Sequence, residues 1–244
     1  MTDARPKQTP GAKMQYLIKR RAGTSREELI AHWYANHMPG VIARNAQNRA
    51  AGRPHARHYV ASLFNPEGDA PQAWDGVAQL WYDAPLPRPA QASGVEPYDT
   101  FQQKVEPYWP WATHEWVVVD GKLPLEPLTL NAPFPCTRSG FLKQVSLVAA
   151  KPGADVRALC DHWLDVHLPN VRDTMLAVGG FRYAVSLSIH PDQAPYAGMA
   201  ELYFPDRAAQ DAFWAALEPD GFQEWVDAER TLRYRCGTEM IGIE

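Results

Sequence analysis

Short runs of alternating or continuous apolar residues recur along the chain, and runs of this kind predict β-strands. In the first half they are residues 14–20, 57–64, 74–83 and 114–120. In the second half they are residues 143–150, 181–188, 196–205 and 237–244. Helical patterns follow the first and third strand of each half, the later ones being 96–108 and 206–217. Each half therefore predicts the order strand–helix–strand–strand–helix–strand.

One string of residues occurs twice. Residues 29–41 read LIAHWYANHMPGV and residues 159–171 read LCDHWLDVHLPNV, so both contain H-W-x3-H-x-P. A residue suited to cap a helix precedes each string, Thr24 or Ser25 in the first half and Asp155 in the second. Two copies in one chain indicate that the chain is an internal duplication.

The repeated order of elements is typical of the ferredoxin-like fold, an antiparallel sheet covered on one face by two helices. We expect a first repeat at 14–120, a proline-rich linker at 121–141 and a second repeat at 142–244. Two such sheets in one chain can bury their uncovered faces against each other. The predicted fold class is therefore α+β, with two tandem ferredoxin-like (split βαβ) repeats forming an intramolecular pseudo-dimeric α/β barrel.

The H-W-x3-H-x-P string and the Y-x-x-S strand resemble the EthD family, over both repeats. The resemblance implies a dimeric α/β barrel with a lyase- or cyclase-like pocket. That barrel group includes cofactor-free cyclases, dehydratases, decarboxylases and monooxygenases, as well as isomerases and haem proteins. The family pattern before the second strand is L-P-G-L-R-R-Y, but the first repeat has RPHARHY at 53–59, which adds His55 and His58. We therefore expect the first pocket to be the more polar and the active one.

Composition and charge limit the classes of partner and the location that we expect for the protein. The chain of 244 residues has 28 acidic and 24 basic side chains and no basic stripe, which argues against a nucleic acid as the main partner. No apolar run reaches the roughly 18 residues of a membrane span. The polar segment 1–13 and three scattered cysteines are typical of a cytoplasmic protein. Nine Trp, ten Tyr, eight Phe and eight His suit an apolar pocket with polar groups.

The repeated helix carries the first catalytic candidates, His37 and His167. At about 100° per residue, Leu29, Trp33 and His37 share the stripe that faces the sheet. We expect Pro39 to end or kink the helix, and a helix end would raise the pKa of His37. A histidine titrating near neutrality in an apolar cleft is the commonest general acid or base. Alternatively the ring only hydrogen-bonds a carbonyl and orients the turn, and its presence in both repeats favours this alternative.

The strands carry the other candidates. Tyr59 and Tyr183 occupy matching positions, where a hydroxyl can donate to a developing enolate or phenolate, unless each is simply a buried tyrosine with a satisfied hydroxyl. The candidates for substrate binding are Trp33, His58, Gln79, Trp81, Trp163 and Glu201. Strand alternation places His58 on the face opposite Tyr59, and the two tryptophans are alternatively core anchors. Gly76 and Ala78 leave room for a close approach.

These candidates together predict a cofactor-independent lyase of the dehydratase, decarboxylase or cyclase type. Its substrate is a small hydrophobic molecule, aromatic or polyketide-like, and its catalysis is acid–base chemistry by His and Tyr. We expect no cofactor and no metal, because His32 and His37 are five residues apart rather than the three or four that suit two ligands on a helix. The chain is expected to be a monomer or homodimer. The alternatives are a monooxygenase, cofactor-free or haem-bound, and a non-catalytic carrier or accessory protein of an aromatic pathway.

Overall fold

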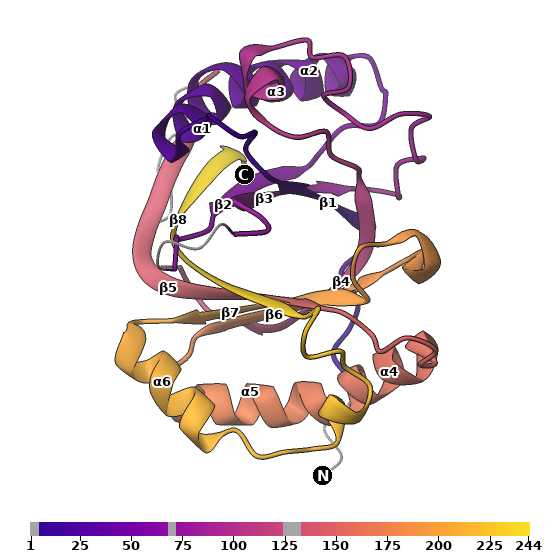
Figure 1. Cartoon of the computed structure of the whole chain (residues 1–244), viewed down its shortest axis with the longest axis vertical. Coiled ribbons are helices and arrows are strands. Elements are labelled where there is room, and N and C mark those ends of the chain that lie inside the picture. The colour runs from indigo at the N-terminus through magenta and orange to yellow at the C-terminus, as the bar shows by residue number, and fades with distance from the viewer. Residues whose placement is uncertain (1–4, 68–71, 124–132) are drawn as a thin grey trace. The chain divides into compact units, whose positions relative to one another are not determined.

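A computed structural model describes residues 5–67, 72–123 and 133–244 (Figure 1). The first repeat contains β1 (Ala12–Ile18), α1 (Arg26–His32), a π-helical turn (Trp33–His37), α2 (Met38–Ala50), β2 (His58–Leu63), β3 (Gly76–Tyr82), α3 (Thr100–Lys104) and β4 (Trp111–Asp120). The second contains β5 (Cys136–Val148), α4 (Val156–His162), a π-helical turn (Trp163–His167), α5 (Leu168–Ala177), β6 (Arg182–Ser188), β7 (Gly198–Phe204), α6 (Arg207–Ala216) and β8 (Leu232–Ile243). The predicted order of elements is confirmed in both repeats.

All the paired strands described are antiparallel. In the first repeat β3 pairs with β1 and with β2, and β2 also pairs with the end of β8. In the second repeat β7 pairs with β5 and with β6, and β6 pairs with β4. The hydrogen-bonded order of the strands is β1-β3-β2-β8-β5-β7-β6-β4. The predicted α+β fold class is therefore confirmed.

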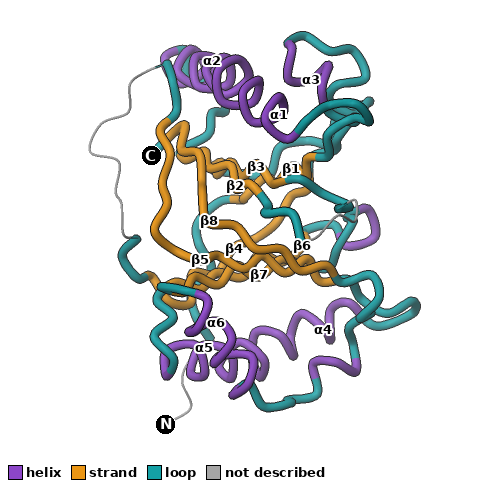
Figure 2. Tube along the Cα trace, turned by 60° about the vertical axis from the view of Figure 1, so that its left-hand side comes forward, coloured by secondary structure: helices purple, strands orange, loops and turns teal. Residues whose placement is uncertain are grey.

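The chain divides into two compact units, and the boundaries of these units differ from those of the two repeats. One unit contains Gly11–Ala112 and the final segment Thr238–Glu244, and the other contains Thr113–Pro124 and Gly140–Gly237. β4, β5 and β8 thus each contribute residues to both units. β5 begins at Cys136, inside the segment 121–141 expected as a linker, of which 124–132 lie outside the described residues. In each unit the helices cover the sheet strands of the same repeat (Figure 2).

The two repeated helices begin at the predicted caps. Ser25 Oγ accepts the backbone N–H of Glu28, whose carboxylate accepts the N–H of Ser25 in return. Asp155 accepts two N–H groups at the start of α4. Such reciprocal caps satisfy donors that have no partner within the helix.

The expected helix end at Pro39 is wrong. The helix instead widens into a π-helical turn, in which the N–H of Met38 bonds to the carbonyl of Trp33, and then continues as α2. Pro39 stands at the start of this new α-helical segment, where its missing N–H is tolerated. The second repeat has the same arrangement at Pro169. Because His37 is followed by 13 helical residues, it does not lie at the negative end of a helix dipole.

The core of the first repeat lies between its helices and one face of β1–β3. Trp33 is fully buried there and packs against Phe101, with ring centroids 5.2 Å apart. A Cβ on Gly76 would lie 2.6 Å from the carbonyl oxygen of Ser62 and 3.1 Å from the Trp33 ring. Gly76 therefore permits the close approach that its small size predicted, and Gly198 does the same for Trp163 in the second repeat.

The helix expected over 96–108 is much shorter, because α3 covers only Thr100–Lys104. Pro97 and Pro107 flank it, and a residue preceding a proline disfavours helical backbone angles. The backbones of Ser93 and Tyr108 instead pair with each other, closing the loop around α3. This loop brings additional aromatic side chains over the helix-covered face of the sheet.

Candidate functional site

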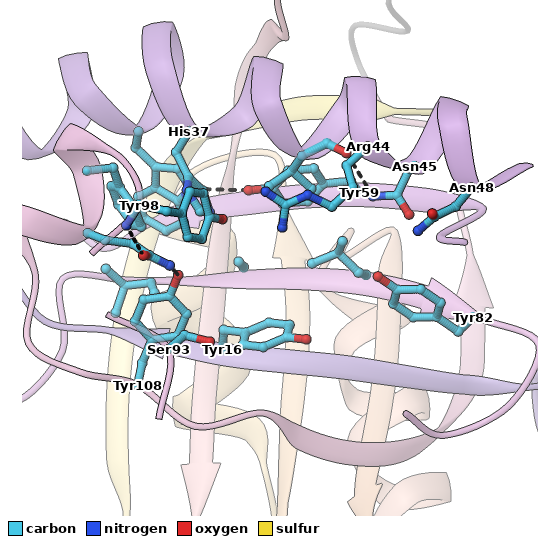
Figure 3. Close-up of a pocket in the computed structure, with 17 residues that line it drawn as sticks. Tyr16, His37, Arg44, Asn45, Asn48, Tyr59, Tyr82, Ser93, Tyr98 and Tyr108 are labelled. Atoms are coloured by element: carbon cyan, nitrogen blue, oxygen red, sulfur yellow. Dashed lines mark hydrogen bonds between the residues drawn. The ribbon is translucent and has the colours of Figure 1, made fainter. Parts of the chain in front are cut away.

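A pocket of about 220 Å³ lies in the first repeat, between α2, the loop around α3 and the sheet (Figure 3). The strands contribute Tyr16, Ile18, Tyr59, Ala78, Leu80 and Tyr82. The long helix contributes Trp33, His37, Val41, Arg44, Asn45 and Asn48. The loop and α3 contribute Ser93, Tyr98, Phe101, Gln102 and Tyr108. The lining is thus mainly aromatic and apolar, with one histidine, one arginine and several hydroxyls.

His37 is held in the pocket wall by Asp99. The side chain of His37 is 9% exposed, and its Nδ1 lies 2.7 Å from Oδ2 of Asp99. Oδ1 of Asp99 accepts the backbone N–H of Gln102, so the carboxylate also caps α3. Burial would raise the pKa of Asp99, but the hydrogen bonds from His37 and Gln102 outweigh burial and lower it. Asp99 therefore stays ionised and accepts the Nδ1 proton, which leaves Nε2 of neutral His37 as the basic atom.

Two tyrosines are oriented by neighbouring N–H groups. The Tyr59 oxygen accepts a hydrogen bond from Trp33 Nε1 at 3.3 Å, and the Tyr108 oxygen accepts one from Gln102 Nε2 at 3.2 Å. Each oxygen thus has an acceptor position filled while its own O–H proton remains available to donate. Burial raises the pKa of both tyrosines, and of Tyr16 beside them, so all three are neutral donors at physiological pH.

Tyr98 and Arg44 lie at the outer side of the pocket. The Arg44 guanidinium lies 4.9 Å from the centroid of the Tyr98 ring, in cation–π contact. The Tyr98 ring in turn stacks beside His37, with centroids 6.1 Å apart. The sequence pattern did not single out either residue.

The second repeat has its own histidine–carboxylate pair. Nδ1 of His167 lies 2.8 Å from Oδ2 of Asp220, which also accepts a hydrogen bond from Asn170. The ring of Phe222 stacks on His167, with centroids 3.9 Å apart and planes 5° apart. Burial lowers the pKa of His167 and outweighs the opposing effect of Asp220.

Apolar side chains replace the polar side of the first pocket in the second repeat. At the constant offset of the repeated string, Asn45 corresponds to Met175 and Asn48 to Val178. Met175 is fully buried in a core cluster with Tyr183 and Trp163. The Tyr183 hydroxyl and Trp163 Nε1 are buried and outside hydrogen-bonding geometry with any described residue. At these two positions, apolar packing therefore replaces the polar side chains that line the first pocket.

Five of the six sequence-predicted binding residues are not among those that line the first pocket, and one of them, Trp163, is buried in the core of the second repeat. Ala78, Leu80 and Tyr82 line it, so Gln79 and Trp81 point from the other face of β3. Gln79 is buried there against Gln15, and the exposed His58 packs its ring edge-on against Trp81. Glu201 belongs to the second repeat, where it forms a buried ion pair with Lys143 at 2.7 Å. Trp33, His37 and Tyr59 are thus the predicted residues that the structure brings together.

The extra histidines do not supply the polarity of the first pocket. Neither His55 nor His58 is among its lining residues, and His55 Nδ1 instead lies 3.0 Å from the carbonyl oxygen of Arg53. The polarity comes from tyrosines and from Arg44. Asp99 is the functional neighbour that sequence reasoning missed, although an Asp immediately before a helical segment is a recognisable capping signal.

The remaining repeated histidines have packing roles. His32 Nδ1 lies 2.8 Å from the hydroxyl of Thr100, and His162 stacks with Phe222. Within the described residues, no group of three or more His, Cys, Asp or Glu side chains is arranged to hold a metal ion. Over the same part of the chain, none of the helices has the length and hydropathy needed to span a membrane.

The family model of the EthD domain matches residues 151–230, which lie within the second repeat. No curated protein matches the sequence. Among solved structures, an anthrone oxidase-like protein is 11% identical, with a TM-score of 0.54 over 97% of this chain and 95% of that chain. A chlorite dismutase variant from Candidatus Nitrospira defluvii is 10% identical, with a TM-score of 0.48 over 93% of this chain and 92% of that chain. The similarity to the anthrone oxidase-like protein supports the fold described above.

The pocket does not fit a haem, although a histidine backed by a carboxylate is a suitable axial ligand. Its volume is about 220 Å³. Sites for drug-sized ligands begin at about 300 Å³, and a porphyrin with its side chains is larger than most such ligands. The aromatic rings of Phe101 and Tyr98 also lie directly beside His37, at centroid distances of 4.4 and 6.1 Å.

Proposed function

We propose that the first repeat forms the active site of a cofactor-independent lyase that acts on a small aromatic or polyketide-like molecule. The observation that carries this proposal is the His37–Asp99 pair in the wall of a pocket lined with tyrosines. A buried base oriented by a carboxylate is suited to remove a proton, and neutral hydroxyls nearby are suited to stabilise the resulting oxyanion.

The proposed reaction begins with proton abstraction. His37 Nε2 takes a proton from a carbon next to a substrate carbonyl, and the electron pair of the C–H bond moves to form an enolate. Tyr59 and Tyr108 donate hydrogen bonds to the enolate oxygen. When the carbonyl re-forms, the electron pair expels a hydroxyl group from the adjacent carbon, and the proton on His37 Nε2 converts this leaving group to water. A carbon–carbon double bond replaces the C–H and C–O bonds, and His37 returns to its neutral form.

The second repeat has a different role in this proposal. His167 lies under the stacked ring of Phe222, and Tyr183 lies in a packed apolar cluster. We propose that both residues maintain the architecture of the second repeat. His167 is then the natural control for His37, because each histidine has a carboxylate partner and follows the same π-helical turn.

Hydrogen exchange on an enolisable aromatic ketone tests this assignment without knowledge of the natural substrate. The protein is incubated with 2-tetralone in deuterated water, and loss of the α-proton signal is followed by proton NMR. We expect the protein to accelerate the exchange and His37→Asn to reduce the protein-catalysed rate about 100-fold, since a general base contributes about 10²- to 10⁴-fold. His167→Asn serves as the matched control and should retain most of the rate. No acceleration, or an equal loss in both variants, would overturn the proposal.

The products distinguish a lyase from the alternatives once a substrate is found. A lyase releases water or carbon dioxide and leaves the dissolved oxygen unchanged. A cofactor-free oxidation, the kind of activity that the name of the anthrone oxidase-like protein suggests for that protein, would begin with the same deprotonation but consume oxygen. A carrier would bind the molecule and release it unchanged.

A further inference from the structure

The proposed chemistry occupies one end of the pocket and leaves Arg44 without a role. Arg44 lines the pocket from α2, and its guanidinium lies over the Tyr98 ring. No ion pair between Arg44 and a carboxylate is described for residues 5–67, 72–123 and 133–244. No carboxylate is among the lining residues of the pocket either. The carboxylate of Asp99 feels the charge of Arg44, but its hydrogen bonds are made with His37 and with the N–H of Gln102 at the start of α3.

Arg44 and His37 lie on nearly the same face of the helix. The two residues are seven positions apart, which returns to nearly the same face of the helix and advances about 10 Å along its axis. Figure 3 shows both side chains on the pocket side of the helix. Ala78 and Leu80 of the sheet line the same pocket and give it an apolar floor suited to an aromatic ring system.

We propose that Arg44 binds an anionic group of the substrate, so that the substrate class is a small aromatic acid that lies with its carboxylate toward Arg44 and its reacting carbon toward His37. This inference rests on the proposed function, because the reacting position is defined by His37. The carboxylate binds the guanidinium at the outer side of the pocket, and the ring system lies on the apolar floor. A guanidinium is well suited to a carboxylate because it donates two parallel hydrogen bonds.

Two further observations support this reading. The positive charge of Arg44 acts on its surroundings, since it lowers the pKa of Tyr82 and Tyr98 against the larger opposing effect of burial. In the second repeat, the position equivalent to Arg44 is Thr174, which carries no charge. The cation is thus specific to the repeat that contains the pocket, as a substrate contact would require.

Calorimetric titration with a matched pair of probes tests the inference. The probes are 6-hydroxy-2-naphthoate and 6-hydroxy-2-naphthamide, which share one ring system and differ in the charge of one group. We expect the wild-type protein to bind the acid more tightly than the amide. Arg44→Met should weaken binding of the acid about fivefold to tenfold and change binding of the amide less than about twofold. Arg49→Met, on the exposed side of the same helix, is the matched control and should leave both affinities unchanged.

The possible outcomes separate this inference from the proposed function. Equal affinity for acid and amide, an unchanged affinity of Arg44→Met for the acid, or no binding of the acid up to about 1 mM would overturn the role of Arg44. Binding is measured without turnover, so the result does not depend on the chemistry at His37. The exchange assay uses 2-tetralone, which has no charge, so its failure alone would overturn the lyase and leave the preference for an acid standing.

Discussion

Replacing Tyr59 and Tyr183 by phenylalanine removes the same hydroxyl from matching positions in the two repeats, with opposite expected effects on stability. Tyr59 is 1% exposed and Tyr183 is fully buried. The Tyr59 oxygen accepts the indole N–H of Trp33 at 3.3 Å. The Tyr183 oxygen and the indole N–H of Trp163 form no hydrogen bond of good geometry among the described residues, although Trp163 still lowers the pKa of Tyr183 against the larger effect of burial.

The magnitudes follow from what each substitution leaves behind. Tyr59→Phe leaves the buried N–H of Trp33 without an acceptor, and such a group costs about 1–3 kcal/mol. Because the bond at 3.3 Å is long, we expect the lower half of this range. Tyr183→Phe removes a hydroxyl whose desolvation is offset only by a weak interaction with Trp163, so the change should be neutral or stabilising by up to about 1 kcal/mol.

Urea denaturation followed by tryptophan fluorescence and far-ultraviolet circular dichroism measures the difference. We expect the midpoint of Tyr59→Phe to fall and that of Tyr183→Phe to stay or rise, with the slope m unchanged in both. The free energies of unfolding should differ between the variants by at least about 1 kcal/mol. Equal destabilisation, or a larger loss for Tyr183→Phe, would refute the assignment of a satisfied tyrosine to the first repeat only.

Two further predictions concern packing and pH. Gly76→Ala should destabilise the protein by about 1–3 kcal/mol, because the new methyl group meets the carbonyl of Ser62 and the ring of Trp33; an unchanged thermal midpoint would contradict this. The unfolded chain binds protons to His167 at a higher pH than the folded chain does, because burial lowers the folded pKa. Stability should therefore fall as the pH drops below about 6.5, and His167→Asn should reduce this fall between pH 7.5 and about 5.5; an identical pH dependence of the urea midpoint in both proteins would count against it.

The features set by nearby residues could be predicted from the sequence. Ser25 and Asp155 cap their helices as expected, since a cap depends on residues within one turn. Strand alternation correctly separates Tyr59 from His58. The continuation of the helix through Pro39 was not predicted, because the π-helical turn that accommodates the proline changes the hydrogen-bond spacing and leaves no simple periodic signal.

The site itself depends on contacts between distant residues. Asp99 meets His37 across 62 positions of sequence, in a segment where a longer helix was expected. In the sequence, Arg44 and Asn48 have the pattern of an ordinary exposed helix face. In the structure they line a pocket together with residues of the loop around α3. The histidines at 55 and 58, which stand out in the sequence, are not among the residues that line the pocket, because His58 lies on the strand face opposite Tyr59 and His55 lies against the carbonyl of Arg53.

The most direct test of the account is the protonation pattern of His37. A nitrogen NMR spectrum of the protein labelled in its histidine rings, with His37 and His167 assigned from their asparagine variants, reports which ring nitrogen carries the proton. The account predicts that neutral His37 carries it on Nδ1, toward Asp99, and that adding 6-hydroxy-2-naphthoate shifts the Nε2 signal of His37 but not that of His167. A His37 protonated on Nε2, or a probe that shifts only His167, would contradict a base in the pocket of the first repeat.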